Sequence, residues 1–119
     1  MAIFTKDGLT LLPEIMDRAI LTSNLIDEPL KGRAQITDFL RALETIYVSA
    51  TDIYRAETHI TEIIVTRVLL ATGTRLTVII IGTRDCDGWI SGIAMDHQPH
   101  SNIAGISRLL SALMSPTPT

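Results

Sequence analysis

The residues of this sequence that could do chemistry gather in three places. Residues 96–100 include two histidines, residues 84–87 include two carboxylates beside a thiol, and Arg67 lies among apolar residues. His97 is the candidate catalytic residue, because a histidine can transfer a proton near neutral pH. A guanidinium in apolar surroundings is costly unless it is paired, so Arg67 is a candidate for binding an acidic or oxygen-bearing group of a ligand.

Each of these groups also has a purely structural explanation. His97 can be a strand-end histidine bonded to backbone, and Arg67 can pair with Glu57 or Glu62 or lie across a subunit interface. Residues 84–87 fit a solvated turn. The histidines of residues 96–100 flank a proline and lack the helical spacing that aims two imidazoles at one ion. We therefore expect no metal and no cofactor.

Length and composition indicate one globular domain. The chain has 119 residues, of which 46% are hydrophobic and only 4% aromatic, so aliphatic side chains and methionine build the interior. We expect a single α+β domain over residues 1–115 and a disordered tail at residues 116–119. The single cysteine, Cys86, excludes an internal disulfide and a zinc site made of several cysteines.

Charge and hydropathy limit the partners. The net charge is −3 and the ten basic residues are scattered, so the basic cluster of a nucleic-acid-binding protein is missing and we expect no nucleic-acid partner. No apolar run reaches about 18 residues, and the first residues lack the basic-then-apolar order of a signal peptide. We expect no membrane partner and a cytoplasmic location.

Three β-rich runs joined by two tight turns predict a meander in the middle of the chain. Residues 63–70, 76–81 and 89–95 are rich in β-branched side chains, and residues 72–73 and 87–88 are turn pairs that contain glycine. Both the odd and the even positions of these strands are mostly apolar, so both faces of the sheet must be covered. A chain this short has too little helix for two faces, and we expect one face to meet a second copy of the chain.

The flanking segments supply the other elements. Residues 33–47 carry apolar side chains at helical spacing and form the clearest amphipathic helix. We expect a curved sheet to hold this helix on its concave face. The remaining expectations are a hairpin around residues 6–8, a short helix from Pro13 with Ile15, Met16 and Ala19 on its apolar side, strands at 19–25 and 53–59, a loop at 27–32, and a last helix capped by Ser101 or Asn102.

The alternation of side chains along a strand sorts the meander into two faces. On its last strand the inward residues are Ser91, Ile93, Met95 and His97. If residues 72–73 form a two-residue turn, the inward residues of the other two strands are Val65, Arg67, Leu69, Val78, Ile80 and Gly82. Together they predict an apolar cavity, the usual form of a small-ligand site, whose polar groups are Arg67, Ser91, His97 and Ser23.

The order of these elements resembles the nuclear transport factor 2-like superfamily, which includes SnoaL-like polyketide cyclases, ketosteroid isomerases and limonene epoxide hydrolases. Residues 19–23, the helix start at residues 29–36 and residues 87–93 carry the resemblance, which extends over residues 13–98. It implies a cone-shaped, curved mixed or antiparallel sheet wrapped around helices, the cystatin-like or SnoaL-like roll. It also implies a pocket inside the cone and a homodimer formed through the outer face of the sheet.

The sequence departs from this family at its start and in its chemistry. Family members usually begin with a long helix that closes the cone, whereas only 18 residues precede Ala19. The base of the ketosteroid isomerases falls on Ser23 and their oxyanion-hole aspartate on Ile80, so neither group is present. The last-strand aspartate of the epoxide hydrolases falls on Met95, and Asp96 points to the opposite face unless a bulge intervenes.

Two functions from different classes remain. The first is a non-catalytic homodimeric domain that binds a small, largely apolar ligand or serves assembly. The second is an isomerase, cyclase or hydrolase acting on a small hydrophobic organic substrate, with His97 as the proton-transfer group and Arg67 or Ser91 positioning an oxygen. An open cavity around His97 and Arg67 favours the enzyme, and an interior filled by side chains favours the first function. The expected ligand-binding residues are Ser23, Phe39, Arg67, Val78, Ile80, Ser91, Ile93 and Met95.

Overall fold

The structure, a computed structural model, describes residues 4–5, 8–9 and 15–114. In chain order the elements are β1 (Phe4–Thr5), β2 (Gly8–Leu9), β3 (Ile15–Ser23), β4 (Leu30–Lys31), α1 (Arg33–Ile46), β5 (Tyr47–Glu57), β6 (Thr61–Leu70), β7 (Arg75–Arg84), β8 (Ile90–Gln98), the 3₁₀ turn η2 (His100–Asn102) and α2 (Ile103–Met114). Six strands form one sheet in the order β4-β3-β8-β7-β6-β5. β3 runs parallel to β8 and the other neighbours are antiparallel, so the sheet is mixed.

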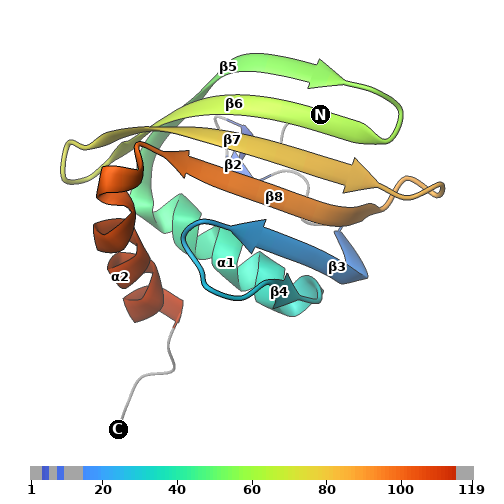
Figure 1. Cartoon of the computed structure of the whole chain (residues 1–119), viewed down its shortest axis with the longest axis horizontal. Helices are drawn as coiled ribbons and strands as arrows, with labels where there is room; N and C mark the ends of the chain where they lie inside the picture. The colour runs from blue at the N-terminus through green and yellow to red at the C-terminus, as the bar shows by residue number, and fades with distance from the viewer. Residues whose placement is uncertain (1–3, 6–7, 10–14, 115–119) are drawn as a thin grey trace, which may run out of the picture.

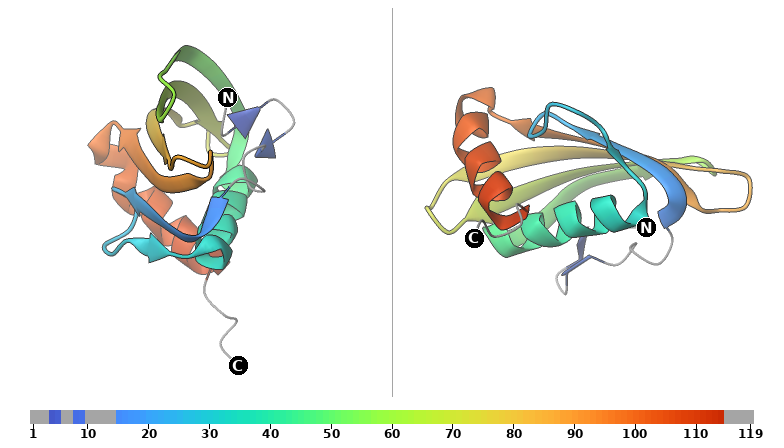
Figure 2. Two further views of the ribbon diagram at one scale, coloured as in Figure 1. Left: turned by 90° about the vertical axis from the view of Figure 1, so that its right-hand side faces the viewer. Right: turned by 90° about the horizontal axis from the view of Figure 1, so that it is seen from below.

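The sheet curls around the two helices, which both lie on its concave side (Figure 1). Seen from below, α1 runs along the sheet and α2 crosses near one end of it (Figure 2). Helix α1 buries one face at the spacing of an amphipathic helix, made of Ile36, Phe39, Leu40, Leu43 and Ile46. The predicted α+β fold class, a curved sheet wrapped around helices, is confirmed.

The junction between α1 and β5 has no loop. Helix α1 ends at Ile46, and Tyr47 already has extended backbone angles while its N–H still donates to the carbonyl oxygen of Leu43. The strand therefore begins at Tyr47, six residues before the predicted start at residue 53, and Tyr47 is not the last residue of the helix. Tyr47 is therefore the first residue of β5, which follows α1 without an intervening loop.

The region before the first long strand differs from the prediction in one element. The predicted hairpin is present, because Phe4 pairs with Leu9 and Thr5 with Gly8. The predicted helix from Pro13 is wrong over its described part, since Ile15 is the first residue of β3 and pairs with Ile90 of β8. Pairing with a long neighbouring strand overrides the weak helical pattern there. Residues 10–14 and the predicted tail at residues 116–119 lie outside the described residues.

The turn between β6 and β7 decides which residues of β6 face inward. Leu69 pairs with Arg75, and the Leu70 N–H donates to the carbonyl oxygen of Thr74, so three residues rather than two form the tip of the turn. One additional turn residue shifts the register by one, and a shift of one residue exchanges the two faces of a strand. The predicted two-residue turn is therefore wrong.

The inward residues of β6 are consequently the even ones. The buried side chains of this strand are Glu62, Ile64, Thr66, Val68 and Leu70. Val65, Arg67 and Leu69 lie on the outer face, so their predicted place on the pocket face is wrong. On β7 and β8 the predicted inward residues Val78, Ile80, Ile93, Met95 and His97 are all buried, as expected.

Three elements near the ends of the chain, β1, β2 and α2, pack against α1 or β5. Strand β1 contacts β5, β2 contacts α1, and α2 packs against α1. The amino-terminal hairpin and the carboxy-terminal helix thus contribute to the cover of the helical side of the cone. Within the described residues, no helix is long and apolar enough to cross a membrane.

The β6–β7 turn gives a direct test of this register. Gly73 has a φ of 88°, in the left-handed region, and a Cβ there would meet no atom within 4 Å. We expect Gly73→Ala to lower the free energy of unfolding by about 1 kcal/mol through backbone strain alone. Urea denaturation measures this change.

The matched control for this test is Gly82→Ala on β7. A Cβ at Gly82 also meets no atom within 4 Å, but the residue lacks a positive φ. We expect this control to leave stability unchanged or to raise it slightly, because alanine restricts the unfolded chain. Equal losses in both variants would contradict the turn geometry.

Candidate functional site

A buried pair of polar rings, Tyr47 and His97, lies inside the cone. His97 has no exposed surface, and Tyr47 is also buried. The Tyr47 hydroxyl and His97 Nε2 are hydrogen-bonded at 2.5 Å, with the two ring centroids 6.2 Å apart. Both side chains are titratable, and this hydrogen bond joins them directly.

The curl of the sheet brings these two residues together. Tyr47 begins β5 and His97 is near the end of β8, and two strands separate β5 from β8 in the sheet. Register pairing places Asp52, Thr66, Val78 and His97 in one row across the inner face. The Tyr47 ring reaches across the concave side to the far end of that row.

Asn24 holds the backbone of His97 from the other side. Its Nδ2 donates to the His97 carbonyl oxygen at 2.8 Å, and the His97 N–H donates to its Oδ1 at 2.9 Å. Strand β3 ends at Ser23, so the amide side chain takes over the backbone pairing that the strand would have supplied. The imidazole is therefore fixed both through its backbone and through its ring.

Burial sets the charge of the pair. Desolvation lowers the pKa of His97 to about 4, against a smaller opposing effect of the Asp96 carboxylate, and burial raises the pKa of the Tyr47 phenol above its usual range. Both rings are therefore neutral at pH 7. A neutral imidazole has one nitrogen that carries a proton and one that does not.

The second ring nitrogen of His97, Nδ1, has no hydrogen-bond partner among the described residues. The atom is also buried. Because Nε2 is occupied by Tyr47, Nδ1 is an unsatisfied donor in one tautomer and an unsatisfied acceptor in the other. A buried polar atom without a partner costs about 1–3 kcal/mol, so a hydrogen-bonding group placed beside Nδ1 would recover that free energy.

The interior around this pair is filled by side chains. Phe39, Ile80 and Met95 have at most 2% of their surface exposed. Val78 and Ile93 are buried as well, so these five predicted ligand-binding residues are core residues in this conformation. Of the two interiors considered from the sequence, the burial of these five residues fits the filled one better.

The polar residues predicted to line the cavity are dispersed. Arg67 lies on the outer face, away from His97. Ser91 is the unpaired residue of a bulge between β7 and β8, and its hydroxyl donates to the Thr83 carbonyl oxygen at 3.2 Å. Ser23 accepts a hydrogen bond from the Leu25 N–H at the end of β3. Only His97 of the four predicted polar groups lies deep inside the cone.

Three residues of the site were missed by the sequence reasoning. Tyr47 fitted the apolar face of the preceding helix, which concealed that it begins a strand. Thr66 was assigned to the outer face by the wrong turn length, yet it is buried and its hydroxyl donates to Asp52 Oδ1 at 2.9 Å. Asn24 carried no signal, because its role depends on where β3 ends relative to β8.

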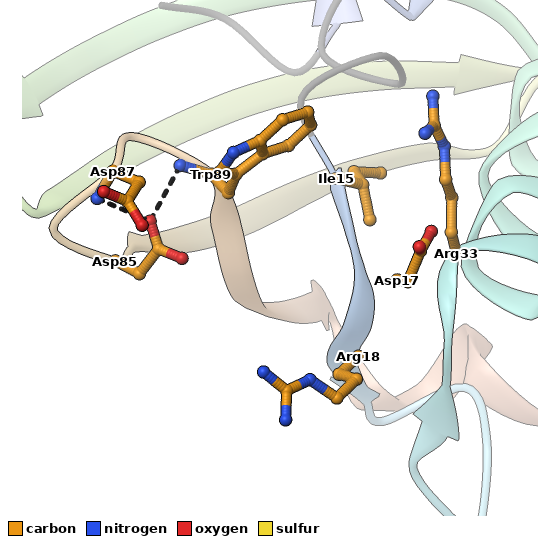
Figure 3. Close-up of a pocket in the computed structure, with 7 residues that line it drawn as sticks. All are labelled: Ile15, Asp17, Arg18, Arg33, Asp85, Asp87 and Trp89. Carbon is orange, nitrogen blue, oxygen red and sulfur yellow. Dashed lines mark hydrogen bonds between the residues drawn. The ribbon is translucent and has the colours of Figure 1, made fainter.

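A surface hollow of about 370 Å³ lies outside this interior (Figure 3). Its lining residues are Ile15, Asp17, Arg18, Arg33, Asp85, Asp87 and Trp89. Asp85 Oδ1 accepts hydrogen bonds from the N–H groups of Asp87 and Trp89, so this carboxylate stabilises the β7–β8 turn. Arg18 and Arg33 point away from each other (Figure 3). With three carboxylates and two guanidinium groups, the hollow favours no single class of ligand.

Comparison with known proteins identifies the fold. No protein-family model matches the chain, and no curated protein sequence matches it. Several solved structures, in contrast, match the chain in their fold. A steroid delta-isomerase from Pseudomonas aeruginosa has a TM-score of 0.77 at 14% identity, covering 86% of this chain and 75% of that one. A bacterial protein with a cystatin-like fold from Silicibacter pomeroyi has a TM-score of 0.80 at 8% identity, covering 86% and 72%.

A third similar structure carries the superfamily name. An NTF2-like protein of unknown function from Cytophaga hutchinsonii has a TM-score of 0.61 at 15% identity, covering 73% of this chain and 81% of that one. The chain therefore has the fold of the nuclear transport factor 2-like and SnoaL-like proteins, as the sequence predicted. At these identities the likeness shows the fold alone.

The low pKa of His97 predicts a pH dependence of stability. Its pKa is about 4 in the folded chain and about 6.5 when unfolded, so the unfolded state binds the proton first as the pH falls. The contribution to stability is complete above pH 6.5 and is lost progressively down to pH 4. The loss is about 1.4 kcal/mol per pH unit at most, about 3 kcal/mol in all.

The measurement is urea denaturation of the wild type and of His97→Phe between pH 7.5 and 4. Other groups titrate in both proteins, so the difference between the two curves isolates His97. We expect the wild type to lose more stability than the variant across this window. Parallel curves would show that His97 is protonated equally in the folded and unfolded states.

Proposed function

We propose that the protein is a homodimeric domain that binds a small, largely apolar molecule carrying one hydrogen-bonding group. The observation that carries this proposal is Nδ1 of His97, which is buried in a mostly apolar interior without a hydrogen-bond partner among the described residues. A ligand group that pairs with Nδ1 gains the hydrogen bond and recovers the free energy that the buried nitrogen now costs. The remainder of the ligand would contact aliphatic side chains.

The filled interior limits what can bind. Phe39, Ile80 and Met95 are buried in the same core cluster as Tyr47, so we expect a ligand to displace side chains on its way to His97. Methionine is the most adaptable of the three, because its unbranched side chain has three rotatable bonds. These constraints favour a small ligand that selects an opened minor conformation of the protein.

The same site supports binding better than it supports catalysis. A general base works best with a pKa near the working pH, and the pKa of His97 is about 4. A neutral imidazole at pH 7 can accept a proton, so an isomerase, cyclase or hydrolase using His97 as the proton-transfer group is the alternative. Its weak basicity makes this alternative the second choice.

The outer face of the sheet supports the homodimer. Apolar side chains of β6 and β7 stand on that face without cover among the described residues, namely Ile63, Val65, Ile79 and Ile81. Both Ile63 and Ile81 have more than a third of their surface exposed. A contiguous apolar patch on a sheet face is typical of a protein–protein interface. A second copy of the chain is the partner that brings the same patch.

Thermal unfolding against a panel of small apolar compounds tests the ligand site. The panel comprises steroids, terpenoids and aromatic polyketides. A ligand that binds only the folded state at 100 times its Kd adds about 2.7 kcal/mol of stability, which raises Tm by several degrees. We expect at least one compound with a hydrogen-bonding group to raise Tm in the wild type.

Two variants of the ring pair locate the binding site. We expect His97→Phe to lose the ligand-induced rise in Tm, because it removes Nδ1. Tyr47→Phe is the matched control, since it removes the hydroxyl and leaves Nδ1 in place. If no compound raises Tm, or if His97→Phe retains the full rise, the ligand site proposed here is wrong.

Analytical ultracentrifugation at micromolar concentration tests the homodimer. We expect a species of twice the 13.0 kDa chain mass. Ile79→Asp should dissociate or aggregate the protein, because it places a carboxylate in the middle of the apolar patch. Ser49→Asp on β5 should leave the dimer intact, since Ser49 is an exposed polar residue of the edge strand. A monomeric wild type refutes the homodimer.

A further inference from the structure

The hydrogen bond between Tyr47 and His97 has a direction, and this direction decides what Nδ1 can bind. A neutral imidazole carries its single proton on one of its two ring nitrogens. If the Tyr47 hydroxyl donates to Nε2, the imidazole proton lies on Nδ1, and Nδ1 is a donor. If Nε2–H donates to the Tyr47 oxygen instead, Nδ1 is an acceptor. The two tautomers of His97 therefore select different ligand groups.

The acid and base strengths of the two rings favour donation by Tyr47. A phenol has an ordinary pKa of about 10, and an imidazolium has one of about 6.5. The phenol O–H is a far stronger acid than the N–H of a neutral imidazole, and the unprotonated imidazole nitrogen is a far stronger base than a phenol oxygen. A hydrogen bond strengthens as its donor becomes more acidic and its acceptor more basic. The bond from the hydroxyl to Nε2 is therefore the stronger of the two.

The length of the bond indicates the same donor. The Tyr47 oxygen and His97 Nε2 are 2.5 Å apart. Hydroxyl groups donate to oxygen over about 2.5–3.0 Å, whereas N–H groups donate over about 2.7–3.2 Å. The observed distance lies at the short end of the hydroxyl range and outside the N–H range. Burial also raises the pKa of the Tyr47 phenol, so the hydroxyl keeps the proton that it donates.

We propose that Tyr47 sets the ligand specificity of the interior by holding His97 in the tautomer with its proton on Nδ1. The inference rests on the proposed ligand site and names the class of ligand that this site takes. That class is a small apolar molecule with a hydrogen-bond acceptor, such as a carbonyl or ether oxygen. A molecule whose polar group can only donate offers no lone pair to Nδ1–H and gains nothing from it. Tyr47 is a positioning residue, because it acts through His97.

Both partners of this bond are fixed by the fold. The N–H of Tyr47 donates to the carbonyl oxygen of Leu43 at the junction of α1 and β5, which fixes the start of the strand. The backbone of His97 is held by its two hydrogen bonds with the side chain of Asn24. The imidazole is therefore held at its backbone and at Nε2, and Nδ1 is the ring nitrogen that is left for a ligand.

This tautomer also limits the chemistry of His97. The ring nitrogen with a free electron pair is the one that accepts from Tyr47, and the nitrogen that is left for a ligand already carries a proton. Toward a ligand at Nδ1, His97 is therefore a hydrogen-bond donor and not a general base, which needs an unprotonated nitrogen within reach of the substrate. The same tautomer thus favours binding of an acceptor molecule over proton abstraction from it.

Nitrogen-15 NMR of the histidine rings tests the tautomer without any ligand, because protonated and unprotonated imidazole nitrogens have well-separated chemical shifts. In the wild type at pH 7 we expect a protonated Nδ1 and an unprotonated Nε2 in His97. His59 is exposed and serves as the internal reference for an imidazole in water. In Tyr47→Phe we expect part of the proton population of His97 to move to Nε2. A wild-type His97 with its proton on Nε2, or an unchanged tautomer in Tyr47→Phe, overturns the proposal.

Three small probes of similar shape test the specificity, namely 2-indanone, indole and indane. 2-Indanone offers a carbonyl acceptor, indole offers an N–H donor, and indane offers neither. We expect the wild type to bind 2-indanone at least about tenfold more tightly than indole, and indole no more tightly than indane. Titration of Tm against probe concentration measures these affinities. Tyr47→Phe should still bind 2-indanone but discriminate less against indole, and His97→Phe should bind all three probes equally weakly.

The outcomes separate this proposal from the ligand site on which it rests. If neither these probes nor any compound of the larger panel raises Tm, the ligand site is wrong and the proposed specificity falls with it. If the wild type binds indole as tightly as 2-indanone and His97→Phe loses both, the ligand site stands and the tautomer assignment is overturned. If the larger panel gives a ligand but none of the three probes binds, the NMR result alone decides between the two tautomers.

Discussion

The hydrogen bond between Tyr47 and His97 depends on the curvature of the entire sheet. It joins the first residue of β5 to the end of β8 across the concave side, although two strands lie between them in the sheet. A flat sheet would keep these residues three strand spacings apart, more than about 14 Å. The bond also requires both rings to be neutral, because an unpaired charge is too costly at a position without exposed surface. The curvature of the sheet therefore has two consequences. It makes the concave face into which α1 packs, and it brings Tyr47 within hydrogen-bonding distance of His97.

Much of this fold follows from local patterns in the sequence. The helix Arg33–Ile46 and the meander β6-β7-β8 were predictable, because helical spacing and β-branched runs with glycine turns are strong signals. Which residues of β6 face inward was not predictable, since that depends on whether the turn at Gly73 has two or three residues at its tip. This single residue moved Arg67 out of the predicted site and Thr66 into the interior. Of the two residues of the site, only His97 could be predicted, because it lies on a strand whose inward and outward residues alternate regularly. The position of Tyr47 could not, because it depends on the residue at which the helix ends and the strand begins.

The two faces of the sheet differ in what they leave unsatisfied. Inside, among the described residues, the buried side-chain atom without a hydrogen-bond partner is Nδ1 of His97. Outside, the unsatisfied feature is exposed apolar area on β6 and β7. A missing hydrogen bond is satisfied by one well-placed polar atom, which is the reason that we propose a small ligand for the interior. Exposed apolar area is removed from water only by another surface of similar size, which is the reason that we propose a protein partner for the outer face.

Strand β8 connects these two requirements, because consecutive residues serve opposite faces. Ala94 and Asp96 lie on the outer face of the sheet, whereas Met95 and His97 are buried in the core. A shift of β8 by one residue would exchange the two sets and destroy both surfaces at once, and the paired hydrogen bonds between Asn24 and the His97 backbone oppose such a shift. Asn24 also lines a surface hollow of about 280 Å³ together with Ala94 and Asp96. Asn24, which fixes the backbone of His97, is thus also part of the outer surface. The register of β8 assigns alternate residues of this strand to the interior and to the outer face.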